Sequence, residues 1–437
     1  MAPVPDVPKD LAGVTDNVLK PGDPGGPWEG FVRPVGADEV ELGAPLAWSV
    51  YDREGKLLFV QGMVLASQTH IDLVLERGML VPDTAVTEGV LVAEFDRLAD
   101  DTQAEEGSDD TEQDAEDEQP PAEPEPPVFR EMQKLRRELR ALHDELLQRS
   151  GEPLTEPLLE LASRLRALVA RDADAALAAM QLDVGDDGQI TRLLHAATLC
   201  DLLVRARDWD EEEGLSIIAA ALTYDVALNP FATAMNQQQA ELSADQRQLI
   251  ADHPQAGVEL LQQAGVEDPI WLAAVLQHHE RVDGSGYPNG LSGEAISRGA
   301  RKLAIADIYS AMVRPRAYRE AVHARHALRS LFLERGRAVD EELASLLVRE
   351  IGVFPPGTPV RLANGEVGVV LRRGRGATRP IVARLINANG TLAALATQRD
   401  SARPEYAISE TLPPRKYQDL VASASELWCS ERTVLRP

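Results

Sequence analysis

A run of acidic residues from Asp100 to Pro127 is the feature that most constrains how this chain can fold. The run holds thirteen Asp or Glu and no Lys or Arg, and it ends in the sequence PPAEPEPP. Such a segment repels itself and buries too little apolar surface to fold, so we expect a disordered linker at 99–128. An acidic docking tail is the alternative. In both cases the 437 residues divide into separate parts on either side of the run.

The part before the linker predicts an arm and a small module. Residues 1–35 are rich in Pro, Gly and Asp and lack periodicity, which is typical of a flexible arm. In LAWSVYDREGKLLFVQGMVL two runs that favour β-structure flank a turn at Gly55, and this pattern predicts a hairpin. SQTHIDLVLERGML then has apolar residues at helical spacing. We therefore expect a small N-terminal α/β or β module over 36–98.

The part after the linker predicts a mostly α fold. FREMQKLRRELRALHDELLQRS indicates an amphipathic helix at 129–152, suited to signalling or to dimerisation, which leaves a homodimer open. Helical spacing continues over 153–352 and predicts a helical domain. FPPGTPVRLANGEVGVVLRR then changes to a β pattern with an Asn364-Gly365 turn. We expect a C-terminal β-hairpin extension and a tail helix over 353–437.

Charge and composition exclude several classes of function. The net charge of −27 argues against binding nucleic acid or an anionic membrane through a general positive surface. Cys200 and Cys429 form no C-x-x-C pattern, so neither a disulfide framework nor a zinc ribbon is indicated. The N-terminus has no signal-peptide pattern, and no window approaches the roughly 18 apolar residues of a membrane span. We expect a cytoplasmic protein.

Histidines and carboxylates in the helical part suggest a metal site. His195, His253, His278 and His279 occur there, together with Asp225 and Asp307 in apolar stretches where an unpaired carboxylate would be costly. Mixed imidazole and carboxylate ligands suit iron, manganese and zinc. Adjacent histidines can face one centre only near a helix end or beside a second metal. A capping or salt-bridged role for the aspartates is the alternative. The other histidines are expected to be ordinary surface or half-buried residues: His70, His143, His323 and His326.

One long segment carries a resemblance. The sequence HHERVDGSGYPNGLSGEAISRGARKLAIADIYSAM, which starts at His278, resembles the signature of the HD-GYP family. This family is a bacterial branch of the HD metal-dependent phosphohydrolases. The resemblance runs from about Asp183 to Pro356, and the hairpin beyond it is similar to the family's C-terminal extension. It implies a helical HD-type domain that binds divalent metal, such as iron or manganese, and hydrolyses cyclic di-GMP.

The resemblance also implies a set of metal ligands, with His195, Asp225 and Asp307 serving catalysis. The family's paired histidine and its lysine are replaced here by Tyr224 and Leu228. A neutral tyrosine, with a pKa of about 10, is a poor ligand. We therefore expect one retained metal and a doubtful second one, and turnover that is reduced or absent. The implied ligands of the retained site are Asp225, His253, His278 and His279, and those of the doubtful site are His195, Asp225 and Asp307.

The resemblance implies a substrate site as well. Arg316 and Arg319 match a basic pair that contacts nucleotide phosphates, and guanidinium groups suit that role. Gly286 and Tyr287 belong to the GYP loop, which borders the site in relatives and is linked to contacts with GGDEF-domain proteins. An exposed arginine pair and a purely structural turn are the alternatives.

Three functional hypotheses follow. The first is a metal-dependent phosphodiesterase acting on cyclic di-GMP. The second is an inactive, degenerate domain that binds cyclic di-GMP or a cyclase and reports to the N-terminal module through the amphipathic helix. The third is a phosphohydrolase for another nucleotide, against which the DGSGYP motif argues.

Overall fold

The structure is a computed structural model, and its contacts divide the chain into two units, Met1–Glu94 and Phe95–Pro437. The residues that it describes are 33–35, 40–41, 50–51, 57–59, 68–77, 79–80, 127–149, 151–182, 188–206, 210–238, 242–314, 323–374, 376–412 and 425–428. Nearly all of the predicted arm and the acidic linker lie outside these residues.

The first unit contains a small antiparallel sheet with one helix. The sheet has the order β1-β4-β2-β3, and Val50 pairs with Phe59 across β2 and β3, which confirms the predicted hairpin. The elements are β1 (Arg33–Pro34), β2 (Val50–Tyr51), β3 (Leu57–Phe59), α1 (Gln68–Arg77) and β4 (Met79–Leu80).

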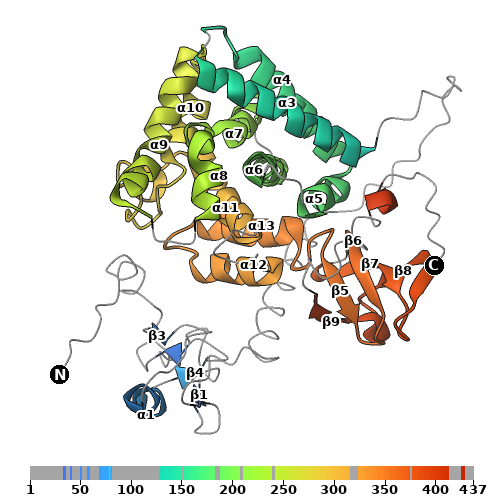
Figure 1. The fold of residues 1–437 in the computed structure, drawn as a ribbon. Helices are drawn as coiled ribbons and strands as arrows, with labels where there is room; N and C mark the ends of the chain where they lie inside the picture. Colours follow the sequence, from blue (N-terminus) through green and yellow to red (C-terminus); the bar gives the residue numbers. More distant parts are fainter. Residues whose placement is uncertain are drawn as a thin grey trace, which may run out of the picture. The chain divides into compact units, whose positions relative to one another are not determined.

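The second unit is mostly helical, as predicted. Figure 1 views α6 nearly end-on, at the centre of the other helices. Because α6 is buried almost all round, it can be apolar on every side, whereas α3 buries only one face. The helices are α3 (Val128–Gln148), α4 (Thr155–Arg171), α5 (Ala173–Leu182), α6 (Gly188–Arg205), α7 (Glu211–Thr223), η3 (Val226–Leu228), α8 (Asn229–Gln237), α9 (Ala244–Gln263), α10 (Pro269–Gln277), η4 (Gly293–Ala295), α11 (Arg298–Met312), α12 (Ala324–Leu333) and α13 (Glu341–Ile351).

Local sequence signals fix where the site-bearing helices begin. Ser243 and Gln246 form a capping box at the start of α9. Asp268 accepts hydrogen bonds from the backbone N–H groups of Ile270 and Trp271 at the start of α10, where Pro269 is the first helical residue. These caps set the ends of the two helices that carry or precede the site histidines.

The predicted amphipathic helix is α3, and its apolar face is occupied within its own unit. Met132, Leu135 and Leu139 are buried where α3 packs on α4 and α5. This face is therefore not available for a dimer.

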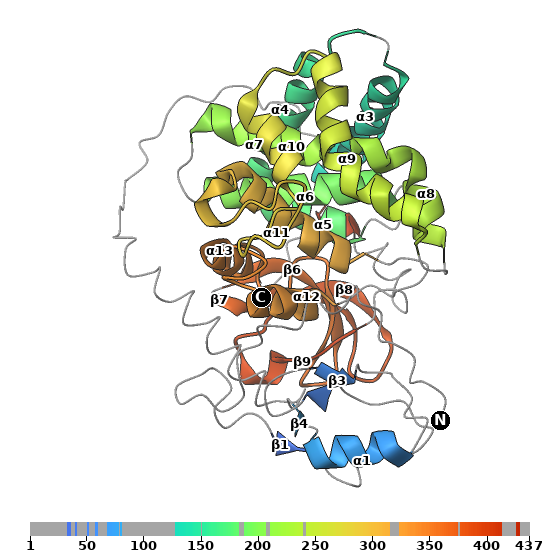
Figure 2. The same cartoon turned by 90° about the vertical axis from the view of Figure 1, so that its left-hand side faces the viewer.

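The C-terminal extension is larger than a hairpin. β5 and β6 pair antiparallel around Gly365, which has φ of 87°, as the Asn-Gly pattern predicts. They belong to a five-stranded sheet of order β8-β7-β6-β5-β9, and Figure 2 shows that sheet beside α12 and α13. The elements are β5 (Pro359–Leu362), β6 (Val367–Gly374), β7 (Gly376–Ile386), β8 (Leu392–Asp400), η5 (Pro404–Tyr406), β9 (Ile408–Thr411) and a 3₁₀ turn, η7 (Ser425–Trp428). The rest of the tail lies outside the described residues, so the tail helix stays a prediction.

Contrary to the expectation from the sequence, one helical stretch of the described residues, Glu211–Ala232, is long and apolar enough to cross a membrane by length and composition alone. It lies in the core of the helical unit, where 67% of its most apolar window is buried. Such burial is what a core helix of a folded domain shows.

Candidate metal centre

Three histidines lie close together in the second unit. His253 lies in α9, His278 caps the C-terminus of α10, and His279 follows it. Their ligand atoms all lie within 4.8 Å of one another. Adjacent histidines can therefore face one centre because the helix ends there, as the sequence analysis requires.

Backbone carbonyls orient two of these rings. Nδ1 of His253 lies 2.6 Å from the carbonyl oxygen of Ile250, and Nδ1 of His278 lies 2.7 Å from that of Val275. Since a carbonyl can only accept, each Nδ1 carries the proton and each Nε2 presents a lone pair. The two Nε2 atoms are 3.2 Å apart.

A carboxylate completes the convergence. Oδ1 of Asp225 lies 3.1 Å from Nε2 of His253 and 3.9 Å from Nε2 of His278. Asp225 is 1% exposed. Burial lowers the pKa of His253 to about 4, and it places the pKa values of His278 and His279 well below 6.5, so all three rings are neutral near pH 7. Neutral imidazoles facing a carboxylate form a donor set that fits a divalent cation.

The second predicted pocket has a different character. The hydroxyl of Tyr224 donates to Oδ1 of Asp307 at 2.6 Å. Burial raises the pKa of Tyr224 well above 10, so the phenol carries its proton here and donates it to Asp307 instead of offering a phenolate oxygen. His195 is buried on α6 against Tyr309, burial lowers its pKa to about 3, and it is not among the clustered histidines.

Arg192 fills the space between the two aspartates. Its guanidinium pairs with Oδ2 of Asp225, and its Nη1 lies 3.6 Å from Oδ1 of Asp307. Gln189 donates a further hydrogen bond to Oδ2 of Asp225 at 2.8 Å. This pocket, as it stands, does not fit a metal ion, because an organic cation and neutral donors already satisfy its carboxylates.

Arg192 was not predicted from the sequence, although a signal was available. Arg192 stands three residues before His195 in a largely apolar helix. Residues three apart share a face of a helix, so an arginine at this position lies on the same face as the histidine.

The GYP loop packs onto the histidine cluster. The ring of Tyr287 stacks on His279 with centroids 4.7 Å apart, and Tyr287 is half-buried. Gly286 does not adopt a positive φ. A Cβ there would lie 2.4 to 2.5 Å from backbone atoms of Arg281, Glu280 and His279, and glycine is required for that close approach.

The buried carboxylate of Glu280 holds the GYP loop in place. Its carboxylate accepts hydrogen bonds from the backbone N–H groups of Asn289 at 2.7 Å and Leu291 at 2.9 Å, and the residue is 3% exposed. No role for Glu280 was predicted from the sequence, although it directly follows the double histidine.

The remaining predicted residues lie elsewhere. Arg316 and Arg319 fall outside the described residues, so their role stays a prediction. His70 and His326 are exposed and His323 is half-buried, as expected. His143 was expected to be ordinary, and this was wrong, because it is fully buried with Nε2 2.8 Å from the carbonyl oxygen of Leu222.

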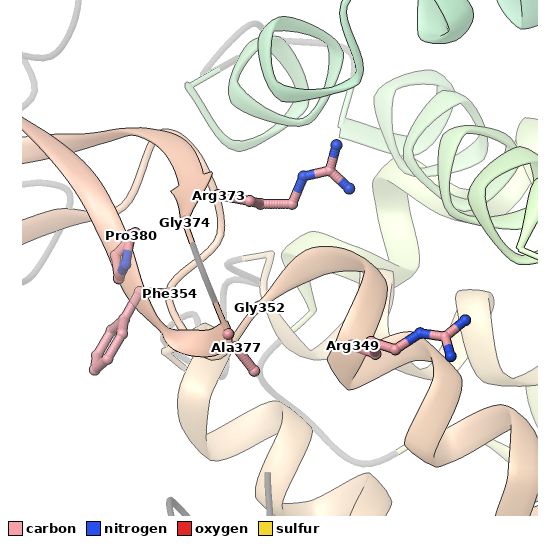
Figure 3. A pocket seen from close by; sticks show the side chains of 8 residues that line it. Arg349, Gly352, Phe354, Arg373, Gly374, Ala377 and Pro380 are labelled. Atoms are coloured by element: carbon pink, nitrogen blue, oxygen red, sulfur yellow. The ribbon is translucent and has the colours of Figure 1, made fainter. Parts of the chain in front are cut away.

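A separate pocket of about 200 Å³ lies where the end of α13 meets β6 and β7 (Figure 3). Its two arginines already have carboxylate partners: Arg373 with Asp174 at 2.6 Å and Arg349 with Glu350 at 3.1 Å. None of the predicted site residues lines it, so it takes no part in the metal centre.

The comparisons with known proteins agree with one another. A family model described as an HD domain matches residues 156–343. A cyclic di-GMP phosphodiesterase of Pseudomonas aeruginosa, PA4108, is 30% identical over 227 residues, which is 51% of this chain and 54% of that protein. The response regulator RpfG of Xanthomonas campestris, also named a cyclic di-GMP phosphodiesterase, is 34% identical over 170 residues, or 38% of this chain and 44% of that protein.

A third relative has another named substrate. The 3'3'-cGAMP-specific phosphodiesterase 2 of Vibrio cholerae is 29% identical over 163 residues, or 37% of this chain and 31% of that protein. The chain spans about half the length, or less, of these curated relatives. The matched residues 156–343 contain the histidine cluster and the GYP loop, so this region of the chain is similar to an HD domain and to the corresponding region of the named phosphodiesterases.

Proposed function

We propose that this chain is an HD-GYP signalling protein that holds one divalent metal ion and binds a cyclic dinucleotide, with hydrolysis slower than in relatives that keep both metal pockets. The observation that carries the proposal is the convergence of His253, His278, His279 and Asp225. A divalent ion held there would supply Lewis acidity toward a phosphate oxygen. Glu280 and Gly286 position the loop beside that centre.

Cyclic di-GMP is the nucleotide we favour. Two of the relatives named above carry it in their names, and the third carries 3'3'-cGAMP, which makes a related cyclic dinucleotide the alternative. The names of these relatives do not choose between the two nucleotides, but both nucleotides contain guanine. The shared chemistry is a guanine base joined to a phosphodiester.

A pocket beside the metal centre supports a guanine ligand. Its volume is about 450 Å³, and its lining includes His253, Phe231, Asp245 and Asp252. Phe231 is 46% exposed and offers a face on which a base can stack. The aspartates can accept hydrogen bonds from the N–H groups of guanine. Arg316 and Arg319 are proposed to contact the phosphates.

Slow turnover follows from the altered pocket. Tyr224 stays protonated and donates to Asp307, and Leu228 stands where the family has a lysine. The same two features favour a second candidate function, a binding module without turnover that signals through α3. A GGDEF-domain protein is the partner we propose for the GYP loop, through its exposed residues Pro288, Asn289 and Gly290. The cytoplasm, where cyclic dinucleotides act, is the proposed compartment.

The test uses the full chain loaded with Mn²⁺. Binding of cyclic di-GMP and of 3'3'-cGAMP is measured by calorimetry, and linear products are followed by chromatography. We expect cyclic di-GMP to bind more tightly, slow product formation, and loss of both in His278→Ala. Phe231→Ala should weaken binding, whereas Leu392→Ala, a matched change at another exposed apolar residue, should not.

Each outcome decides between the candidates. Binding without any product supports the second candidate over the first. Tighter binding of 3'3'-cGAMP overturns the choice of nucleotide. If neither nucleotide binds to the metal-loaded protein, both candidate functions fail.

A further inference from the structure

The guanidinium of Arg192 lies where two site carboxylates approach each other. It pairs with Asp225 and lies 3.6 Å from Asp307, and its Cζ is 5.8 Å from the centre of the Tyr224 ring. The side chain of Arg192 is 14% exposed, and those of Asp225 and Asp307 are 2% and 9% exposed. One cation therefore joins the two aspartates in a nearly buried pocket.

Other donors complete that arrangement. Tyr224 donates to Asp307 at 2.6 Å, and Gln189 donates to Asp225 at 2.8 Å. The carboxylates thus receive a positive charge and two hydrogen bonds from the chain itself. The two carboxylate oxygens of Asp225 have different partners. Oδ2 faces Arg192 and Gln189, and Oδ1 faces His253.

A metal ion could enter this pocket only by displacing the guanidinium. Arginine stays protonated at every pH at which proteins fold. Displacement would leave a positive charge without its carboxylate partners next to a dication, and an uncompensated charge in a nearly buried site is strongly unfavourable. The pocket therefore excludes a second metal even when a histidine is restored at position 224.

We propose that Arg192 takes the place of the second metal ion as a built-in cation, so that the chain binds one divalent ion and Tyr224→His alone does not create a second site. This inference rests on the proposed metal centre at His253, His278 and His279. It makes Arg192 a positioning residue that holds Asp225 so that one oxygen faces the histidines.

The test counts metal ions and needs no nucleotide. The full-length protein is loaded with Mn²⁺ and freed of excess metal. Bound Mn²⁺ per chain is measured by mass spectrometry, and electron paramagnetic resonance separates a single ion from a coupled pair. We expect one ion in the native protein, one in Tyr224→His, and two in the double variant Arg192→Ala with Tyr224→His.

Matched variants isolate the guanidinium. Arg205 lies on the same helix and pairs with the buried Asp201 at 2.7 Å, away from the site, so Arg205→Ala with Tyr224→His should hold one ion. Arg192→Lys with Tyr224→His keeps a cation and should also hold one. If the alanine double variant does not fold, Arg192→Gln with Tyr224→His preserves most of the side-chain volume and is expected to hold two.

The failures are distinguishable. Two ions in the native protein or in Tyr224→His overturn the role of Arg192, as does a folded double variant that still holds one. No ion in the native protein overturns the proposed metal centre itself.

Discussion

Tyr224 and Asp225 are neighbours in sequence, yet they serve opposite halves of the site. Asp225 turns one oxygen toward His253, and Tyr224 turns its hydroxyl toward Asp307, 83 residues away. A histidine in place of Tyr224 would have offered a lone pair to a metal ion. The tyrosine instead offers a proton to a carboxylate, so this single exchange converts a ligand position into a donor position.

Tyr224→Phe tests that assignment. Removing the hydroxyl leaves the nearly buried Asp307 with one donor fewer, which should lower the free energy of unfolding by about 1–3 kcal/mol. Mn²⁺ affinity at the histidine cluster should stay the same, because Tyr224 is not one of the clustered ligands. Denaturant unfolding and a chelator competition measure the two quantities. Loss of Mn²⁺ binding would show that Tyr224 is a ligand after all.

Gly286→Ala tests the close approach of the GYP loop. The added Cβ meets backbone atoms, so the loop must move and Tyr287 should leave His279, at a cost of about 1–3 kcal/mol. Faster hydrogen exchange of the amides over 284–291 and a lower Tm should follow. Gly188→Ala is the control, since nothing lies within 4 Å of its added Cβ. Equal effects of the two substitutions would contradict the assigned packing.

At the scale of elements, the amphipathic helix α3 contacts the turn that carries the site. His143 on α3 is fully buried, with Nε2 2.8 Å from the carbonyl oxygen of Leu222 and Nδ1 2.5 Å from the side-chain nitrogen Nδ2 of Asn229. Leu222 and Asn229 stand on either side of Tyr224 and Asp225. A displacement of α3 would therefore shift the turn that carries Asp225. The proposed signalling through α3 requires such a connection to the metal centre.

His143→Phe tests this connection. Phenylalanine has a similar shape but cannot hydrogen-bond, so the buried carbonyl of Leu222 and the half-buried side-chain amide of Asn229 lose a partner, and the free energy of unfolding should fall by about 1–3 kcal/mol. Because the affected turn carries Asp225, Mn²⁺ affinity should fall as well. His326→Phe, at an exposed position of α12, should change neither Tm nor affinity. A stability loss without any change in affinity would argue against coupling to the metal centre.

At the scale of the whole molecule, the C-terminal sheet has its own polar centre. Glu366, at the β5–β6 turn, accepts from Nε of Arg399 at 2.8 Å and from Nη1 of Arg384 at 3.3 Å. These arginines come from β8 and β7, so one carboxylate joins the β5–β6 turn to two further strands. Hydrogen bonds from Arg399 are the largest cause that lowers the pKa of Glu366 to about 2.

Glu366→Gln should therefore destabilise the protein in a pH-dependent way. The pKa of Glu366 is lower in the folded state than its ordinary 4.5, so its contribution is complete above that value and is lost as the pH falls toward 2. The Tm difference between native protein and variant should be largest near pH 7 and shrink below pH 4.5. Glu410→Gln, at an exposed ion pair with Arg361 on the same sheet, should show little difference at any pH. A Tm difference that does not depend on pH would contradict this.

The helical class, the two hairpins β2–β3 and β5–β6, and the histidines of the metal centre could be predicted from the sequence. These depend on local periodicity, on turn chemistry and on one contiguous motif. Only the tertiary structure decided how the altered pocket is filled, since Arg192, Asp225 and Asp307 come from three separate elements. It also decided that His143 is buried and that Tyr287 stacks inward. Periodicity shows which face of a helix is apolar. It does not show which distant side chain contacts a polar residue of that helix, because such contacts depend on how the helices pack around α6.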